Sequence, residues 1–509
     1  MCALLEGRDV LLVSPTGSGK SLSYQVAGVL LEGVTVVVSP LLALQADQIH
    51  GLGTEHPELR AARISSEESE SRREEILEQA RRDEIEFLFL APEQLANPEV
   101  RSALREVAPS LVAVDEAHCV STWGHDFRPD NPRLGDLLAD IGAPPVIAMT
   151  ATAALPVRED IVDRLHLRDH ELVVTGFARD NIALDVVRVV TAGDQRRTVL
   201  DLVAARPGTG IVYCRTRRSA EEYAGLLAEA GRSTAVYHAG LSRKARAKAH
   251  EAFQAGDVEI VVATSAFGMG IDKPDIRFVV HAQVPESPDT YYQEVGRAGR
   301  DGEPASGVLV YRSEDLSLGK FFSGGVPREQ EVAAVLKALS RSRGDSTRDT
   351  RARKVSEGTG LGPRKTGRIL NLADEVRESG GAEGAGRRAV AAVVDRAEAY
   401  RRLQQSRVDM MRGYAETDRC RMAYLLAYFG EPPEGLCGMC DNCLAGVAGE
   451  EVADNATYRL QSRVRHEDFG EGVVTDVEED RLTVLFEDVG YRTLSLRLVE
   501  EQGLLEPAV

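Results

Sequence analysis

The sequence predicts an α/β protein: two lobes with parallel sheets, followed by a helical, winged-helix-like segment, a cysteine-rich module and a small β-barrel. Short apolar runs alternate with longer polar or amphipathic stretches, and this pattern occurs twice in series. Helical periodicity then replaces it, and four of the seven cysteines crowd into one short segment. Because 509 residues exceed the roughly 250–300 at which a single core stops growing, we expect at least three domains.

Buried strands are predicted from short apolar runs in both lobes, since parallel strands covered on both faces are continuously hydrophobic. The boundary between the lobes is expected near Thr175 to Asp185. The predicted strands are Val10–Val13, Val34–Val38, Glu86–Leu90, Leu111–Val114 and Val146–Met149 in the first lobe, and Ile211–Tyr213, Ala235–Tyr237, Glu259–Val262, Phe278–Val280 and Gly307–Val310 in the second.

After Asp315 helices are predicted up to the cysteines, interrupted by a Gly-rich loop or wing at Ser379 to Gly386. Past Leu444 a polar linker leads to Val464–Leu505, where short β runs punctuated by Gly predict the barrel. The predicted domains are residues 1–178 and 179–320 for the lobes, 321–395 for the helical segment, 396–446 for the cysteine module, 447–460 for the linker and 461–509 for the barrel.

The net charge of −19 argues against a protein that coats nucleic acid over its whole surface. A local basic window exists at Arg341–Arg377, with ten Lys or Arg against five Asp or Glu. The apolar runs are far shorter than the roughly 20 residues that span a bilayer, and the N-terminus carries no secretory pattern. We therefore expect a cytoplasmic protein, associated with the nucleoid if bacterial, and no membrane partner.

A glycine-rich sequence, Ser14-Pro-Thr-Gly-Ser-Gly-Lys20-Ser21, lies between a predicted strand and a helix-forming stretch, as a phosphate loop requires. Backbone N–H groups and the helix N-terminus can cradle phosphates, while Lys20 adds a positive charge and Ser21 a magnesium ligand. Ser14 stands where the general pattern has glycine, and the alternative is an ordinary strand-to-helix turn. The residues predicted to bind ATP here are Pro15, Thr16, Gly17, Ser18, Gly19, Lys20 and Ser21.

An acidic pair, Asp115-Glu116, follows the predicted strand Leu111–Val114 and precedes Ala117-His118. A carboxylate at the C-terminal end of a strand can hold magnesium, and its neighbour can activate the attacking water. Asp115 suits the metal and Glu116 the base. Alone such a pair is more often a solvated loop, but together with the phosphate loop it predicts ATP hydrolysis.

These residues resemble superfamily 2 helicases, and the stretch from Cys119 to Asp130 is similar to the aromatic-rich loop of the RecQ family. The resemblance covers most of Gly7 to Leu444. It implies two RecA-like lobes and an ATP-dependent DNA helicase that moves 3′ to 5′ and acts in recombination or repair. Further matching segments are Ser39–Leu44, Thr150-Ala-Thr152, Ile211–Ala220, Ala263–Asp272 and Gln293–Gly302.

In that family's scheme the second lobe completes the ATP site when the lobes close. The resemblance assigns Arg300, with Arg297 beside it, to the transition-state charge, a contribution of about 10³ to 10⁵ in rate. Gln293 would orient the attacking water or sense the nucleotide, and Asp272 would meet the nucleotide. Closing and opening would then be the power stroke.

The aromatic-rich loop follows Glu116 directly and would couple DNA binding to hydrolysis. Trp123 and Phe127 can stack on bases of a single strand, each stack worth about 1 to 3 kcal/mol, while His125 and Arg128 would contact DNA or relay its presence. The alternative for Trp123, the only tryptophan, is a place in the core. His118 is interpreted as a coupling residue, or else as a hydrogen-bonded structural one.

The cysteine module contains Cys420, Cys437, Cys440 and Cys443, separated by sixteen, two and two residues. Four thiolates at this spacing suit tetrahedral zinc, and the sequence resembles the RecQ zinc module. Since four protein ligands leave no position for water, the metal is expected to be structural.

The sequence departs from the RecQ pattern at two places. The upstream glutamine element that recognises adenine is missing, since only nineteen residues precede Lys20; we expect either a start before Met1 or weaker adenine selectivity. The family's winged helix follows its zinc module, whereas here a helix-turn-helix-like stretch precedes it, with a turn at Gly358–Leu361. Its predicted DNA contacts are Arg364, Lys365 and Arg368, and the alternative is a solvated basic helix pair.

The tail from Val464 to Gly490 resembles the small Tudor-like barrels of CarD and of UvrD-type helicases. In those proteins such barrels can contact RNA polymerase, so RNA polymerase or another protein is an expected partner. The alternative is a folding cap without a partner.

Together these features predict a RecQ-type helicase that uses ATP, Mg²⁺ and Zn²⁺ and binds single-stranded DNA and duplex junctions. One rival is an RNA helicase, or a translocase that does not separate strands. Another is a non-catalytic DNA- or polymerase-binding adaptor, against which Lys20, Glu116 and Arg300 argue.

Overall fold

The computed structural model describes residues 1–508 except 41, 66–67, 96, 122–133, 269–270, 272, 323–324, 342–347, 379, 381–383, 385, 434 and 450–456, and describes only the backbone at 43, 318, 320–322, 348–352, 364 and 378. The chain forms two compact units. The first comprises Met1–Asp315 and Met411–Ala453, and the second comprises Leu316–Met410 and Asp454–Val509. In the described part of the chain, no helix combines the length and apolar character needed to cross a membrane.

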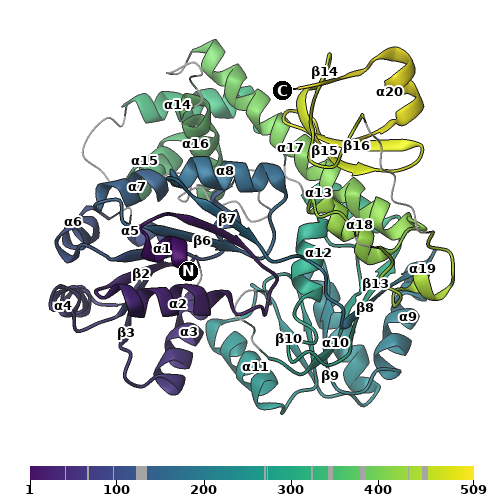
Figure 1. Cartoon of the computed structure of the whole chain (residues 1–509), viewed down its shortest axis with the longest axis horizontal. Coiled ribbons are helices and arrows are strands. Elements are labelled where there is room, and N and C mark those ends of the chain that lie inside the picture. The colour runs from purple at the N-terminus through teal and green to yellow at the C-terminus, as the bar shows by residue number, and fades with distance from the viewer. Residues whose placement is uncertain are drawn as a thin grey trace. The chain divides into compact units, whose positions relative to one another are not determined.

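The first lobe contains a seven-stranded parallel sheet, of which β2, β3, β6 and β7 are labelled in Figure 1. The strand order is β3-β4-β2-β5-β6-β1-β7. The inner strands are buried along their whole length, as a parallel sheet covered on both faces requires. The elements are α1 Cys2–Leu5, β1 Val10–Val13, α2 Lys20–Leu31, β2 Thr35–Val38, α3 Leu42–Glu55, β3 Ala61–Ile64, α4 Glu70–Arg81, β4 Phe87–Leu90, α5 Pro92–Leu95, α6 Pro98–Val107, β5 Leu111–Val114, η1 Ala117–Val120, α7 Leu134–Asp140, β6 Val146–Thr150, α8 Leu155–Leu165 and β7 Glu171–Val174.

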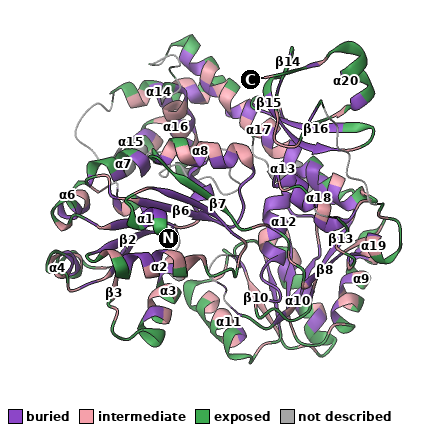
Figure 2. Ribbon diagram, viewed as in Figure 1, coloured by how far each residue is buried: buried purple, intermediate pink, exposed green. Residues whose placement is uncertain are grey.

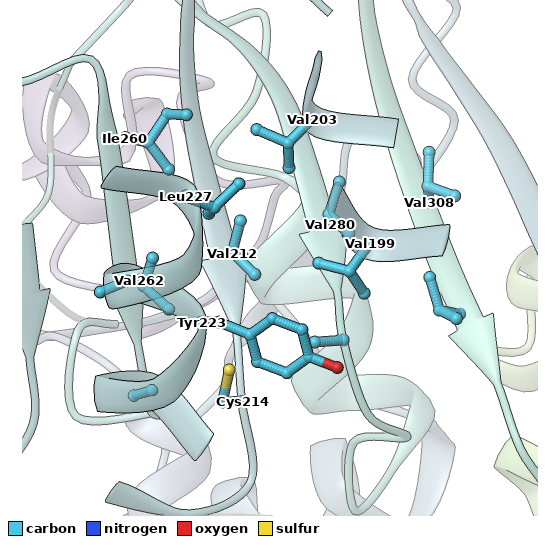
Figure 3. Close-up of a cluster of buried hydrophobic side chains, with 14 of the residues drawn as sticks. Val199, Val203, Val212, Cys214, Tyr223, Leu227, Ile260, Val262, Val280 and Val308 are labelled. Carbon is cyan, nitrogen blue, oxygen red and sulfur yellow. The ribbon is translucent and has the colours of Figure 1, made fainter. Parts of the chain in front are cut away.

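The second lobe is a six-stranded parallel sheet in the order β10-β11-β9-β12-β13-β8. Its core packs Val199 and Tyr223 from helices against Val212, Val262 and Val280 from strands (Figure 3). The elements are β8 Ile182–Arg188, α9 Ala192–Ala204, β9 Thr209–Tyr213, α10 Arg217–Glu229, β10 Thr234–Tyr237, α11 Arg243–Ala255, β11 Ile260–Ala263, β12 Ile276–His281, α12 Pro288–Val295 and β13 Ala305–Tyr311.

Two parallel sheets in series were predicted, and both are confirmed, with every predicted strand overlapping an observed one. Three strands were not predicted: β3, β7 and β8, each at an edge of its sheet. All of β7 except Val173 is exposed, and β3 is mostly half-buried (Figure 2). Without a continuous apolar run, an edge strand does not stand out from the surrounding polar chain.

The helical segment of the second unit has its own core, in which Val335, Val355, Ile369 and Val393 are buried together. Two of its helices, α15 and α16, lie where the sequence predicts the helix-turn-helix. The helices after the second lobe are α13 Asp315–Phe322, α14 Glu329–Arg341, α15 Arg348–Thr359, α16 Pro363–Glu378, α17 Arg387–Glu416, α18 Arg421–Tyr428 and α19 Asp441–Leu444; the last two, and the end of α17, belong to the first unit.

The C-terminal part of the chain is a five-stranded antiparallel sheet in the order β17-β16-β15-β14-β18. Its elements are β14 Arg463–His466, β15 Gly470–Val477, β16 Arg481–Phe486, β17 Gly490–Ser495, α20 Leu496–Gln502 and β18 Leu505–Pro507. A barrel was predicted, whereas the ladders between described residues form a sheet whose outer strands, β17 and β18, do not pair. The sheet is tied to α17, because the Tyr491 backbone N–H donates to Ser406 Oγ (3.0 Å).

Candidate nucleotide site and metal centre

The glycine-rich loop joins β1 to α2, as the sequence predicts for a phosphate loop. Gly17 and Gly19 have φ of +84° and +79°, a left-handed conformation that side chains disfavour. Gly19 caps α2, which begins at Lys20, so the unpaired N–H groups of the first helical turn face the loop. Lys20 Nζ donates to the carbonyl oxygens of Ser14 (2.9 Å) and Pro15 (3.0 Å). Burial lowers the pKa of Lys20, and the charge of Arg300 lowers it further.

Ser14, which replaces the first glycine of the general motif, has a structural contact of its own. Its hydroxyl is buried and lies 2.7 Å from both Ser18 Oγ and Thr175 Oγ1. Thr175 directly follows β7 and opens the segment that leads to the second lobe. The serine therefore links the phosphate loop to the connection between the lobes, which glycine could not do.

The predicted magnesium ligands, Ser21 and Asp115, lie on either side of one glutamine. Gln48 Nε2 is 3.4 Å from Ser21 Oγ and 3.3 Å from Asp115 Oδ2. Burial, with the nearby charge of Glu116, raises the pKa of Asp115 to about 6. A buried carboxylate next to a second carboxylate needs a cation, so this donor set fits a divalent metal bound with phosphate. Gln48 was not predicted as a site residue, because it lies inside α3 and belongs to no sequence motif.

Glu116, the predicted base, is held in an uncommon backbone conformation with φ of +49°. Its N–H donates to Asp115 Oδ1 (2.9 Å), and its Oε2 lies 3.3 Å from His118 Nδ1. His118 is buried, and Nδ1 also lies 3.1 Å from Thr150 Oγ1. Burial lowers the pKa of His118, but the neighbouring Cys119 and Glu116 raise this pKa well above its usual value.

A polar path continues from this histidine into the second lobe. Thr150 Oγ1 donates to the Thr152 carbonyl (3.0 Å), and Thr152 Oγ1 accepts from Gln293 Nε2 (3.1 Å). Gln293, which the sequence analysis assigns to water orientation or nucleotide sensing, therefore reaches the first lobe at the Thr150-Ala-Thr152 motif. The path connects the acidic pair with α12, the helix that carries Gln293.

Arg300 lies against the phosphate loop. A Cβ added at Gly17 would lie 3.1 Å from Arg300 Cγ, so the glycine leaves room for the arginine stem. Arg297 is buried within the second lobe, where its Nη2 would lie 3.5 Å from a Cβ added at Gly268. The structure thus brings Arg300 to the phosphate loop.

Arg179 is a residue of the site that the sequence analysis missed. It follows the first lobe in the chain, and Nη1 donates to the carbonyls of Thr16 (3.3 Å) and Gly296 (3.2 Å). Nη2 donates to the carbonyls of Ala298 (3.1 Å) and Gly299 (3.2 Å). One guanidinium therefore joins the phosphate loop to the turn that precedes Arg300. Its only sequence signal was its place in the predicted boundary between the lobes.

The predicted DNA contacts are only partly visible. Trp123, His125, Phe127 and Arg128 of the aromatic-rich loop lie outside the described residues, as do Asp272 and the side chain of Arg364. On α16, Lys365 is exposed and pairs with Glu331 Oε1 at 2.5 Å, and Arg368 is half-buried.

The four predicted metal ligands come together. The Sγ atoms of Cys420, Cys437, Cys440 and Cys443 all lie within 4.8 Å of one another. Backbone N–H groups point at two of these sulfurs: Cys437 N is 3.3 Å from Cys420 Sγ, and Arg421 N is 3.4 Å from Cys440 Sγ. Four sulfurs this close, two of them receiving N–H groups, match the donor set of a structural zinc site.

Family models cover most of the first unit. Residues 1–161 match DEAD/DEAH box helicase, residues 194–302 match helicase conserved C-terminal domain, and residues 384–444 match RecQ zinc-binding. Among solved structures, helicase Lhr of Mycobacterium smegmatis bound to ssDNA and AMP-PNP has a TM-score of 0.52 and 23% identity, covering 73% of this chain and 54% of that one. Helicase MrfA bound to DNA has a TM-score of 0.52 and 20% identity, covering 61% and 45%. These two likenesses concern the fold alone.

Two curated relatives come from Bacillus subtilis. The probable ATP-dependent DNA helicase RecS is 35% identical over 87% of this chain and 87% of its own length. The ATP-dependent DNA helicase RecQ is 32% identical over 92% of this chain and 68% of its own length. The match therefore extends through both lobes and the cysteine cluster, and the chain belongs to the RecQ family of superfamily 2 helicases.

Proposed function

We propose that this protein is an ATP-dependent DNA helicase of the RecQ type, which couples ATP hydrolysis to unwinding of duplex DNA. The observation that carries the proposal is the convergence of the phosphate loop, the acidic pair and Arg300 in one unit built from two lobes. An adaptor that only bound DNA would have no need for these residues to converge. The relatives named above support the choice of DNA as the substrate.

In the proposed reaction the phosphate loop receives the nucleotide. The N–H groups at the start of α2 bind phosphate oxygens, and Lys20 exchanges its carbonyl partners, Ser14 and Pro15, for phosphate. Ser21 and Asp115 would hold Mg²⁺, which supplies charge neutralisation when bound. The raised pKa of Asp115 agrees with a carboxylate arranged for a cation.

Glu116 would then accept the proton of the attacking water. Its contact with His118 holds the carboxylate in place, and His118 is in turn held by Thr150. Arg300 would neutralise charge that develops on the transferred phosphoryl group, and Gln293 would report that group's presence to the Thr150–Thr152 turn. Each lobe thus supplies one half of the reaction, so closing of the lobes would control hydrolysis.

The DNA contacts are proposed from the family scheme. Trp123, Phe127, His125 and Arg128 would bind a single strand next to Glu116, and Arg364, Lys365 and Arg368 would bind duplex DNA. Movement in the 3′ to 5′ direction, a role in recombination or repair and a place at the nucleoid are parts of the same proposal. Zn²⁺ would be held by the four cysteines and would fix the module's fold when bound.

For the C-terminal sheet we propose a barrel-like module that binds a protein, with RNA polymerase as the candidate. The proposal of a distinct module is supported by the antiparallel pairing of its strands and by the hydrogen bond that joins it to α17. A pull-down of RNA polymerase by the full chain, compared with a chain ending before Arg463, tests this point. Equal recovery with both chains would refute it.

The proposed enzymatic function is tested by ATP hydrolysis with and without single-stranded DNA. The wild-type chain is expected to hydrolyse ATP faster with DNA, whereas Lys20→Ala is expected to lose hydrolysis while keeping DNA binding. Absence of hydrolysis by the wild type would favour the adaptor. Equal stimulation by RNA would favour an RNA helicase.

A further inference from the structure

Helix α12 (Pro288–Val295) connects two parts of the ATP site. It carries Gln293, which contacts Thr152, and Arg300 follows it after a short turn. All residues of the helix except Gln293 are buried, so its neighbours determine its position. The contacts that fix α12 are therefore contacts that fix the second-lobe half of the ATP site.

Several of these neighbours belong to the zinc module rather than to the second lobe. Tyr428 Oη donates to Asp289 Oδ2 (2.6 Å), and both side chains are buried. Tyr414 Oη donates to Tyr291 Oη (3.1 Å), with the two rings 4.9 Å apart. Phe429 lies 5.0 Å from the ring of Tyr292. Three positions of α12 thus contact one module.

One buried arginine, Arg421, connects the residues that contact α12 with the cysteine cluster. Cys420 caps α18, which starts at Arg421 and ends at Tyr428, next to Phe429. Arg421 Nε and Nη2 donate to the two carboxylate oxygens of Asp441, at 2.9 and 3.1 Å, and Nη1 donates to the Tyr414 carbonyl. Asp441 follows Cys440 directly. The arginine thereby links the cysteines at both ends of the module to Tyr414.

The same module also contacts the connection between the lobes. Phe429 stacks on Phe177 with a ring distance of 4.7 Å, and Glu431 Oε2 accepts from the Phe177 backbone N–H (2.6 Å). Tyr292 Oη of α12 donates to the Phe177 carbonyl (2.7 Å). Helix α12, the connection and the module therefore share one buried cluster of rings and hydrogen bonds.

We propose that Tyr414 and Tyr428 are positioning residues for ATP hydrolysis: they hold α12 in the register that lets Gln293 and Arg300 reach the first lobe. This goes beyond a zinc module that only folds or binds DNA. It rests on the proposed ATP hydrolysis. Small displacements of a catalytic group have large effects on rate, because transition-state stabilisation requires close geometry.

Removing one hydroxyl tests the proposal with a small change in side-chain volume. In Tyr428→Phe a buried carboxylate loses its donor, so we expect the kcat for ATP to fall about tenfold at saturating DNA. We expect three other quantities to stay within about twofold of the wild type: the KM for ATP, the affinity for DNA without nucleotide, and the zinc content. The substitution changes neither the phosphate loop nor the cysteines. Tyr414→Phe should act in the same direction.

Two matched variants separate positioning from general weakening. Asp289→Asn keeps an oxygen acceptor for Tyr428 and should retain most of the turnover, whereas Asp289→Ala should lose it. Tyr311→Phe removes another module-to-lobe hydrogen bond, from Tyr311 Oη to Glu416 Oε1 (2.5 Å), on strand β13 instead of α12. It should leave kcat unchanged.

A second readout does not depend on activity. Hydrogen exchange of the α12 amides should speed up in Tyr428→Phe, while exchange in β9 and β12 stays as in the wild type. The inference is overturned if kcat in Tyr428→Phe is within twofold of the wild type, if Tyr311→Phe falls equally, or if turnover and zinc content fall together. If the wild type itself hydrolyses no ATP, the proposed function fails instead.

Discussion

Arg179 offers a sharp test of how the lobes are joined at the ATP site. Its guanidinium donates to the carbonyls of Thr16 in the phosphate loop and of Gly296, Ala298 and Gly299 before Arg300. Arg179→Lys keeps the charge, but a single ammonium cannot span four carbonyls on two lobes. The substitution therefore removes the bridge and leaves the electrostatics nearly unchanged.

The magnitude follows from the four contacts. Hydrogen bonds from a charged donor contribute about 1.5–3 kcal/mol each, and distances of 3.1–3.3 Å place these at the low end. If lysine retains two of the four, the loss of the other two should lower the unfolding free energy of the first unit by about 3 kcal/mol. Among these four contacts only the one to Thr16 joins the lobes directly, so its loss should raise the barrier to turnover by about 1.5 kcal/mol, which is roughly tenfold in kcat.

The assay is ATP turnover with saturating single-stranded DNA, together with urea unfolding. Arg232→Lys is the matched control, because Arg232 donates to the carbonyls of Val203, Arg206 and Gly208 inside the second lobe, away from the phosphate loop. It should lower stability without lowering kcat. Unchanged turnover in Arg179→Lys, or an equal fall in Arg232→Lys, would refute the bridging role.

Three further outcomes are expected. Arg300→Ala should lower DNA-stimulated hydrolysis by about 10³ with little change in nucleotide binding, measured by single turnover; a loss under tenfold would contradict its contact with transition-state charge. Burial raises the pKa of the Cys214 thiol, so this thiol stays protonated at pH 8 and should resist alkylation until the protein unfolds, whereas exposed Cys2 should react. Mass spectrometry of the labelled peptides measures both reactions, and rapid labelling of Cys214 in the folded protein would contradict the prediction. Chelation of the metal should destabilise the module around Cys440 and release about one zinc per chain; a thermal transition unaffected by chelator would speak against a structural zinc.

Much of the fold was predictable because it depends on local pattern. Inner strands such as Leu111–Val114 are continuous apolar runs, and their alternation with helices predicts that they pair in parallel. The zinc cluster was also predictable, because the spacing of Cys437, Cys440 and Cys443 in the sequence is typical of a zinc site. The edge strands β3 and β7 were missed because their burial is incomplete.

The site was predictable only where a motif carries it. Lys20, Ser21 and Asp115 are recognisable in the sequence, but Gln48, which lies between the last two, is one glutamine in an ordinary helix. Arg179 donates to backbone carbonyls of segments that are far apart in the chain. Because every residue has a backbone carbonyl, such contacts cannot be recognised from residue types. Contacts made by tertiary packing need the fold before they can be seen.

Strand displacement on a tailed duplex tests the central claim most directly. With ATP and magnesium, the wild-type chain is expected to release the labelled strand from a 3′-tailed duplex and to leave a 5′-tailed duplex intact. Lys20→Ala, which is expected to keep DNA binding but lacks the phosphate contact, should release neither. Release by Lys20→Ala, or ATP hydrolysis by the wild type without any release, would contradict the account.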